Sequence, residues 1–217
     1  MPRTIAIGDI HGCSQALDAI LRAIKPQPDD TIVALGDYID RGTDSRGVVE
    51  RMLALAKECR LVPLMGNHEI MLLDALERGT YDSGWLLCGG KETLQSYGGG
   101  LENIPPEHIE FFRSLVPYFE TDTHFFVHAN YQYDMPLADQ PDYLLYWEHL
   151  HLSPPRPHDG GKRAIVGHTS QKSCEILDLG HVVCLDTFCH GGGWLTALDV
   201  ESGKVWQADR FGNLRAT

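Results

Sequence analysis

Near its N-terminus the chain reads Thr4-Ile5-Ala6-Ile7-Gly8-Asp9-Ile10-His11-Gly12, an apolar run that ends in polar residues. The apolar part has the length of a buried strand. Residues 14–24 follow with apolar side chains at helical spacing, and Pro26 stops this helix. The segment therefore predicts a strand, a polar loop and a helix, in that order.

The same pattern occurs twice more along the first half of the chain. Strands are predicted at 31–37 and 61–67, and helices at 45–59 and from about residue 68 to 76. Strands that alternate with helices indicate right-handed crossovers and a largely parallel sheet covered by helices.

The second half of the chain has a different pattern. Residues 80–116 favour helices and loops, and from Tyr118 onward short apolar runs predict strands at 125–128, 164–167, 175–177, 181–185, 195–198 and 204–206. This half is expected to be more antiparallel. Together the halves predict an α/β fold of two packed sheets flanked by helices, in one domain over residues 1–217.

Composition limits the function classes. The chain has 217 residues, of which 18 are Lys or Arg and 30 are Asp or Glu, so its formal charge is −12. This balance repels nucleic acid and anionic membranes, and neither is expected as a partner. No apolar run approaches the ~20 residues of a membrane helix, and no secretory leader is seen near the start, so a cytoplasmic location is expected.

Polar side chains stand where the first three predicted strands end. Asp9 and His11 follow the first strand, Asp37 follows the second and Asn67 follows the third. Carboxyl ends of parallel strands meet at one edge of a sheet, so these side chains should converge. Each offers an oxygen or imidazole ligand that suits a divalent cation, and the set lacks the thiolates of a structural zinc site.

Two later histidines hold equivalent places. His128 follows the apolar residues 125–127, and His168 follows residues 165–167. With them the set holds three oxygen ligands and three imidazoles, which is too many for one tetrahedral ion. The set predicts two ions that share one carboxylate, and Asp37, from the central motif, is the predicted bridge.

Five ordered motifs resemble the phosphoprotein phosphatase (PPP) family of calcineurin-like metallophosphoesterases. The motifs are Gly8-Asp9-Ile10-His11-Gly12, Gly36-Asp37-Tyr38-Ile39-Asp40-Arg41-Gly42, Gly66-Asn67-His68-Glu69, His128-Ala129-Asn130 and Gly167-His168-Thr169. They span nearly the whole chain. The chain looks closest to the compact bacterial and phage lambda-type serine/threonine phosphatases, and it is also similar to bacterial hydrolases of symmetric diadenosine tetraphosphate. The resemblance implies a four-layer αββα sandwich.

The resemblance also implies which residues would bind metal. The first ion would be held by Asp9, His11 and Asp37, and the second by Asp37, Asn67, His128 and His168. Mixed oxygen and imidazole ligands accept Mn²⁺, Fe, Zn²⁺ or Co²⁺, and Mn²⁺ is the expected ion. Two ions about 3.5–4 Å apart can activate a shared water as hydroxide for direct attack on phosphorus.

Three further residues are assigned catalytic roles by the resemblance. His68 would be the general acid beside the leaving group, with Asp40 orienting it, and Arg41 would grip the phosphate oxygens. A proton donor helps an alkoxide to leave by about 10²–10⁴-fold. The planar fork of an arginine matches two phosphate oxygens.

Each of these residues also has a simpler structural interpretation that needs no metal ion. Asp9 and Asp37 could cap helices, His128 and His168 could be buried histidines without a ligand role, and Asp40 and Arg41 could form a loop salt bridge. Each applies readily to a residue taken alone. The joint occurrence of all of them inside ordered motifs favours the metal site.

One departure from the family pattern concerns the phosphate. Family members usually carry a second phosphate-binding arginine after the His128 region, and here His149 stands at that place. Arg156 or Arg163 from the following loop could substitute.

The expected function is a metal-dependent phosphomonoester hydrolase acting on phosphoserine or phosphothreonine of proteins, or on small phosphoesters. The rivals are a dinucleoside polyphosphate hydrolase and a non-catalytic scaffold that binds phosphorylated partners.

Overall fold

Two five-stranded mixed sheets form the centre of the molecule. The structure is a computed structural model that describes residues 2–216, so the first and last residues of the predicted domain 1–217 lie outside it. The first sheet has the order β10-β9-β1-β2-β3 and the second β4-β5-β6-β8-β7. The first contains β1 (Thr4–Ile7), β2 (Thr31–Ala34), β3 (Arg60–Pro63), β9 (Leu195–Asp199) and β10 (Val205–Ala208). The second contains β4 (Tyr118–Glu120), β5 (His124–Val127), β6 (Arg163–Val166), β7 (Leu177–Asp178) and β8 (Val182–Cys184).

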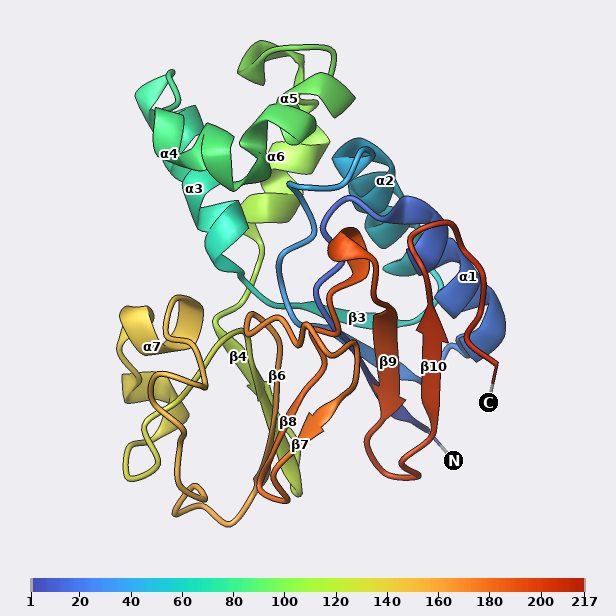
Figure 1. Ribbon diagram of the computed structural model, residues 1–217, viewed down its shortest axis with the longest axis vertical. Helices are drawn as coiled ribbons and strands as arrows, with labels where there is room; N and C mark the ends of the chain where they lie inside the picture. The colour runs from blue at the N-terminus through green and yellow to red at the C-terminus, as the bar shows by residue number, and fades with distance from the viewer. Residues whose placement is uncertain (1, 217) are drawn as a thin grey trace.

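Helices cover the outer faces of these sheets. They are α1 (Ser14–Ile24), α2 (Ser45–Leu55), α3 (Asn67–Arg78), α4 (Ser83–Trp85), α5 (Lys91–Ser96), α6 (Pro106–Arg113) and α7 (Asp142–Tyr146). In Figure 1, α7 lies beside the second sheet, α1 and α2 lie beyond the first, and α3 to α6 form a helical group above the sheets. Within residues 2–216, every helix falls short of the length and apolar content needed to span a bilayer.

Three apolar clusters correspond to the three interfaces between these layers. Side chains alternate along a strand, so neighbouring residues serve opposite faces. Ile5 and Ile7 pack in the cluster that contains the apolar face of α1, whereas Ala6 between them packs in the cluster that also contains Phe126 of the second sheet. Phe125 packs with Leu145 of α7 in the third cluster. This alternation confirms the predicted fold of two mixed sheets flanked by helices.

The pairing of the second half departs from the expectation in two respects. The strands β5, β6 and β8 pair in parallel, so the second sheet is less antiparallel than predicted. The hairpin β9–β10 joins the first sheet instead, where β9 pairs antiparallel with β1. The two C-terminal strands therefore form one edge of the sheet that also contains the first strand of the chain.

Candidate metal centre

The predicted ligands come from loops at the carboxyl ends of parallel strands in both sheets. Asp9 and His11 follow β1, Asp37 follows β2, and Asn67 is the first residue of α3 after β3. From the second sheet, His128 follows β5 and His168 follows β6. All but His168 are buried, and His168 is partly buried. The two sheets therefore present their ligands to one place.

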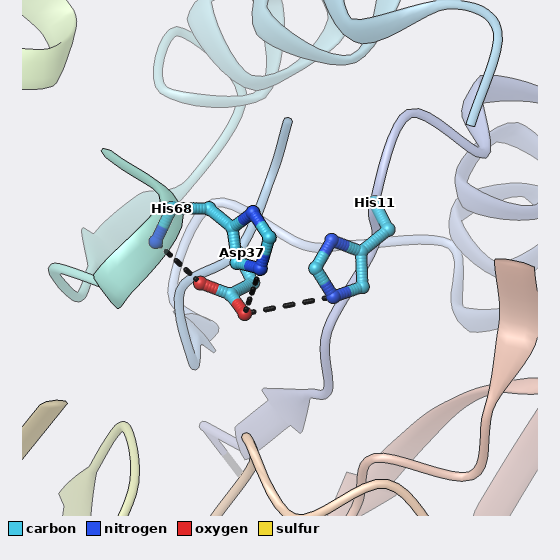
Figure 2. A group of neighbouring side chains, drawn as sticks. All are labelled: His11, Asp37 and His68. Atoms are coloured by element: carbon cyan, nitrogen blue, oxygen red, sulfur yellow. Dashed lines mark hydrogen bonds and ion pairs between the residues drawn. The ribbon is translucent and has the colours of Figure 1, made fainter. Parts of the chain in front are cut away.

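Asp37 lies at the centre of this group. Its Oδ2 atom is 3.5 Å from His11 Nε2 and 3.8 Å from His68 Nε2, and its Oδ1 atom is 3.4 Å from His128 Nε2. Figure 2 shows His11 and His68 pointing at this carboxylate. Two groups of side chains could each hold a metal ion, namely His11, Asp37 and His68, and Asp37, His128 and His168. Asp37 belongs to both, as a bridging ligand would.

Asp9 and Asn67 lie at the edges of this cluster. Asp9 is in neither of the two groups, and its carboxylate accepts a hydrogen bond from the backbone N–H of His168 at 2.9 Å. The Oδ1 atom of Asn67 is 3.0 Å from His128 Nε2 and 3.0 Å from His168 Nδ1. Asp9 and Asp37 are not the N-cap residues of α1 and α2, which are Cys13 and Asp44, although Asp37 Oδ1 accepts from the backbone N–H of His68 in the first turn of α3 at 3.2 Å.

The imidazoles are oriented as metal ligands are. His11 Nδ1 is 2.9 Å from the carbonyl of Ile39, and His128 Nδ1 is 2.7 Å from the carbonyl of Leu35. A carbonyl only accepts, so the proton must sit on Nδ1, and Nε2 keeps its lone pair toward Asp37. His168 likewise has Nε2 at 3.1 Å from the carbonyl of Trp147. Such contacts fix ligating histidines in metal sites.

The electrostatics also suit bound cations. Burial lowers the pKa of His11 well below its usual value and, with His128 nearby, that of His168 to about 3, so both rings are neutral at pH 7. Burial, together with the Asp186 and Asp37 carboxylates, raises the pKa of Asp9. Burial also opposes ionisation of Asp37, but the surrounding imidazoles hold its pKa well below the usual range. Buried carboxylates this close together need positive charge, which divalent ions would supply.

The backbone is strained at these residues. His11, Asp37, Asp40, Arg41 and His168 have φ between 45° and 70°, a region that residues other than glycine seldom adopt. Such strain persists only when the surroundings enforce it, and it gathers at functional sites.

His68 and Asp40 form a buried pair beside the cluster. His68 Nδ1 lies 2.6 Å from Asp40 Oδ2. The Asp40 carboxylate also accepts hydrogen bonds from the indole N–H of Trp85 at 2.8 Å and from the hydroxyl of Thr93 at 2.6 Å. Burial lowers the pKa of His68, but the Asp37 and Asp40 carboxylates outweigh it and raise that pKa above its usual value. The two carboxylates therefore favour a protonated His68, against the opposing effect of the Arg41 guanidinium, which lies 3.1 Å from Nε2.

Arg41 contacts two histidines, His11 and His68, instead of forming a salt bridge with Asp40. Its two terminal nitrogens are 3.1 Å from His11 Nε2 and 3.1 Å from His68 Nε2. Its backbone N–H donates to the carbonyl of Gly89, and a Cβ atom at Gly89 would lie 2.4 Å from that nitrogen. Close packing against a glycine thus holds Arg41 at the site.

The positions of Arg156, Arg163 and His149 show which of them could make a second contact to the phosphate. The guanidinium of Arg156 lies 4.2 Å from the ring centroid of Tyr133, and Arg163 pairs with Asp178 at 2.7 Å. Neither lines the cavity of about 410 Å³ at the cluster, whereas His149 does. His149 stacks on His168 with ring centroids 4.4 Å apart, and its buried Nδ1 has no hydrogen-bond partner among the described residues.

Several residues that support the site were not predicted. The two carboxylate oxygens of Glu69 accept hydrogen bonds from the backbone N–H groups of Gly66, Asp37, Tyr38 and Ile39. Glu69 thereby fixes the loop that carries Asp37. Its signal in the sequence is an acidic residue at the third position of a helix. Trp85 and Thr93, which bind Asp40, lie in the segment 80–116 that was expected to form helices and loops, and no local signal marks them.

Comparisons with known proteins agree with this geometry. A family model described as calcineurin-like phosphoesterase matches residues 2–188. Over 85 residues the chain is 44% identical to serine/threonine-protein phosphatase 1 of Salmonella typhimurium, a match that covers 39% of this chain and 37% of that protein. Over 70 residues it is 41% identical to the symmetrical bis(5'-nucleosyl)-tetraphosphatase of Acidovorax sp., covering 32% of this chain and 24% of that protein. These matches therefore span well under two thirds of the length of the relatives.

Solved structures are similar in fold. One is a proposed diadenosine tetraphosphatase, with a TM-score of 0.73 and 23% identity over 96% of this chain and 95% of that one. Another is a cold-active protein-tyrosine phosphatase of a psychrophilic Shewanella species, with a TM-score of 0.67 and 19% identity over 99% of this chain and 80% of that one. At such identities the likeness concerns the fold alone. The family match covers most of the chain, and the chain belongs to the calcineurin-like phosphoesterases, hydrolases that use divalent metal ions.

Proposed function

We propose that the protein is a metal-dependent serine/threonine protein phosphatase. The observation that carries the proposal is the place of His68, which is hydrogen-bonded to Asp40 on one side and directed at the shared ligand Asp37 on the other. A proton donor beside the metal ligands suits an ester whose leaving group is a poor one, such as a serine or threonine alkoxide. A scaffold that only binds phosphate would have no use for this pair.

The donor set fits two divalent ions. Asp9, His11 and Asp37 would hold one ion, and the other would be held by Asp37, Asn67, His128 and His168. When bound, such ions supply an activated water at neutral pH and neutralise charge on the phosphoryl oxygens. Mixed oxygen and nitrogen ligands accept Mn²⁺, Fe, Zn²⁺ or Co²⁺, and Mn²⁺ is the ion that we expect.

Side chains of the protein itself bind the phosphate and protonate the leaving group. Arg41, exposed in the cavity, presents two N–H groups to phosphate oxygens and so orients the phosphorus. His68 gives its Nε2 proton to the leaving oxygen, while Asp40 retains the hydrogen bond at Nδ1 and keeps the ring in this orientation. Trp85 and Thr93 hold Asp40 from behind.

A second candidate is the hydrolysis of symmetric dinucleoside tetraphosphates. It is favoured by the 41% identity to relatives named for that reaction, which is close to the 44% identity to a named protein phosphatase. The same metal centre could cleave an anhydride. The better leaving group of an anhydride would make the acid less necessary, so the two candidates differ in their dependence on His68.

The test compares kcat/KM of the Mn²⁺-loaded protein on an aryl phosphate, a phosphothreonine peptide and diadenosine tetraphosphate. We expect the phosphopeptide to be preferred, and we expect His68→Asn to lower turnover of the peptide by about 10²-fold or more while the bound metal stays at two ions per chain. A large preference for the dinucleotide would establish the second candidate instead. Unchanged peptide turnover in His68→Asn would remove His68 from the role of acid.

A further inference from the structure

A second cavity adjoins the active-site cavity on the side of the helical group. It has a volume of about 340 Å³ and lies between α3 and the segment that contains α4, two elements that contact each other in Figure 1. We refer to it as the α3–α4 slot. Its walls include Met71, Asp74 and Ala75 from α3, and Tyr81, Trp85 and Cys88 from the facing segment.

The slot and the active-site cavity share two wall residues. Met71 and Cys88 line both. Trp85 connects them in a second way, because its ring lines the slot while its N–H donates to Asp40, the partner of His68. A group bound in the slot would therefore lie next to the phosphate that the metal centre and Arg41 receive.

The slot is predominantly apolar and partly aromatic. Tyr81 and Trp85 meet edge to face with ring centroids 6.1 Å apart. Tyr81 keeps 41% of its surface exposed, and its hydroxyl has no hydrogen-bond partner among residues 2–216. Exposed aromatic surface in a concave site next to a catalytic centre is typical of a position where a ligand binds.

The charged side chains at the slot are two carboxylates and one guanidinium, so their net charge is negative. Arg78 and Asp74 form an ion pair at 2.9 Å, and Asp82 accepts a hydrogen bond from the backbone N–H of Trp85 at 2.9 Å. Met71 and Cys88, which line both the slot and the active-site cavity, have no positive charge. A chain of phosphates running from the metal centre into the slot would meet two carboxylates, Asp74 and Asp82, and a single cation, Arg78, which is already paired with Asp74. An uncharged substituent faces no such penalty.

We propose that the α3–α4 slot binds a large apolar or aromatic side chain that neighbours the phosphorylated residue in a phosphopeptide. This inference rests on the proposed protein phosphatase function and adds to it a sequence preference. Burial of a phenylalanine side chain, compared with alanine, is expected to raise kcat/KM by about tenfold.

The test uses matched phosphothreonine peptides that carry Phe or Ala at each position from three before to three after the phosphothreonine. We measure the ratio of kcat/KM for the Phe and Ala peptides with the Mn²⁺-loaded protein. Wild type should show a ratio of about ten at one position. Thr80→Trp, which fills the slot from an exposed residue in its wall, and Tyr81→Ala, which removes its aromatic wall, should both bring that ratio toward one.

Leu87→Ala provides the matched control. Leu87 is 88% exposed in the same segment but does not line the slot, so this variant should keep the ratio of wild type. A ratio near one at every position in wild type, or a ratio that Thr80→Trp and Tyr81→Ala leave unchanged, would overturn the slot alone. If these variants instead impair hydrolysis of diadenosine tetraphosphate selectively, the slot binds a nucleobase and the inference is wrong. Absence of turnover on every phosphopeptide, with the aryl phosphate still hydrolysed, would refute the protein phosphatase function as well.

Discussion

Replacing Asp40 by Asn should shift the pH dependence of turnover, because this change removes the charge that Asp40 places beside His68 and keeps the shape of the side chain. His68 Nδ1 lies 2.6 Å from the carboxylate, which raises the pKa of His68 together with Asp37 and against the effect of burial. A hydrogen bond to a charged partner is worth about 1–2 kcal/mol more than one to a neutral partner. Since one pKa unit corresponds to about 1.36 kcal/mol, the pKa of His68 should fall by about one unit.

The sign follows from the role of an acid. A proton donor acts below its pKa and is lost as pH rises through it, so the alkaline limb of kcat should move to lower pH by about one unit in Asp40→Asn. At pH 8 this shift should lower turnover by up to about tenfold, the factor that one pKa unit can give. The assay is kcat for a phosphothreonine peptide, whose alkoxide leaving group depends on the acid, between pH 5.5 and 9.5, with bound metal measured in parallel.

Asp44→Asn is the control for loss of charge. Asp44 belongs to the same loop, and its carboxylate caps α2 by accepting from the N–H of Gly47, a role that Asn fills about as well. This variant should leave the alkaline limb in place. An unshifted limb in Asp40→Asn, with metal content intact, would show that the proton comes from elsewhere and would refute the role assigned to the His68–Asp40 pair.

Three further outcomes are expected. Removal of metal with a chelator should lower Tm by about 5–10 °C, measured by calorimetry, because ions that bind only the folded chain at 100 times their Kd stabilise it by about 2.7 kcal/mol. His149→Ala should raise KM for an aryl phosphate about 3- to 10-fold with a smaller change in kcat, as expected if the His149 ring, which lines the cavity, contacts the phosphate; an unchanged KM would exclude that contact. Asp30→Asn should cost about 2–3 kcal/mol in urea unfolding at pH 7, because the buried Asp30 binds Arg3 and the N–H of Gln27. Arg3 holds the pKa of Asp30 below its usual value, so this stability is present above about pH 4 and lost as pH falls through the lowered pKa; a difference between wild type and variant that does not shrink as pH falls below about 4 would contradict the account.

Local patterns were sufficient to predict the elements that carry the first three motifs. Residues 14–24 were predicted as a helix, and α1 spans Ser14–Ile24, since apolar spacing defines its buried face and Lys25, in a left-handed conformation before Pro26, ends it. The elements β4 and α7 were not predicted, because three to five residues are too few to show a period. The sheet that β9 and β10 join was likewise hidden, since the register that places Ile5 opposite Asp199 links opposite ends of the chain.

The candidate site, like the fold, could be predicted from the sequence only in part. Its proposed ligands stand in contiguous motifs at strand ends, so the sequence alone was enough to propose them. The residues that orient them could not, because the contacts are distant in sequence: Trp85 and Thr93 bind Asp40 from 45 and 53 positions away. Glu69 stands inside a quoted motif, yet three of its four backbone partners become visible only when the loop after β2 is folded against α3.

The site also connects the two sheets, which links its assembly to that of the fold. His128, which follows a strand of the second sheet, has its Nδ1 at 2.7 Å from the carbonyl of Leu35, which follows a strand of the first. In the opposite direction, Asp9 after β1 accepts from the N–H of His168 after β6. Each sheet therefore orients a predicted ligand of the other. Ions bound between these residues would connect the same two layers, so a change that shifts one sheet against the other, such as a large side chain at the buried Ala6 between them, should weaken metal binding without touching a ligand.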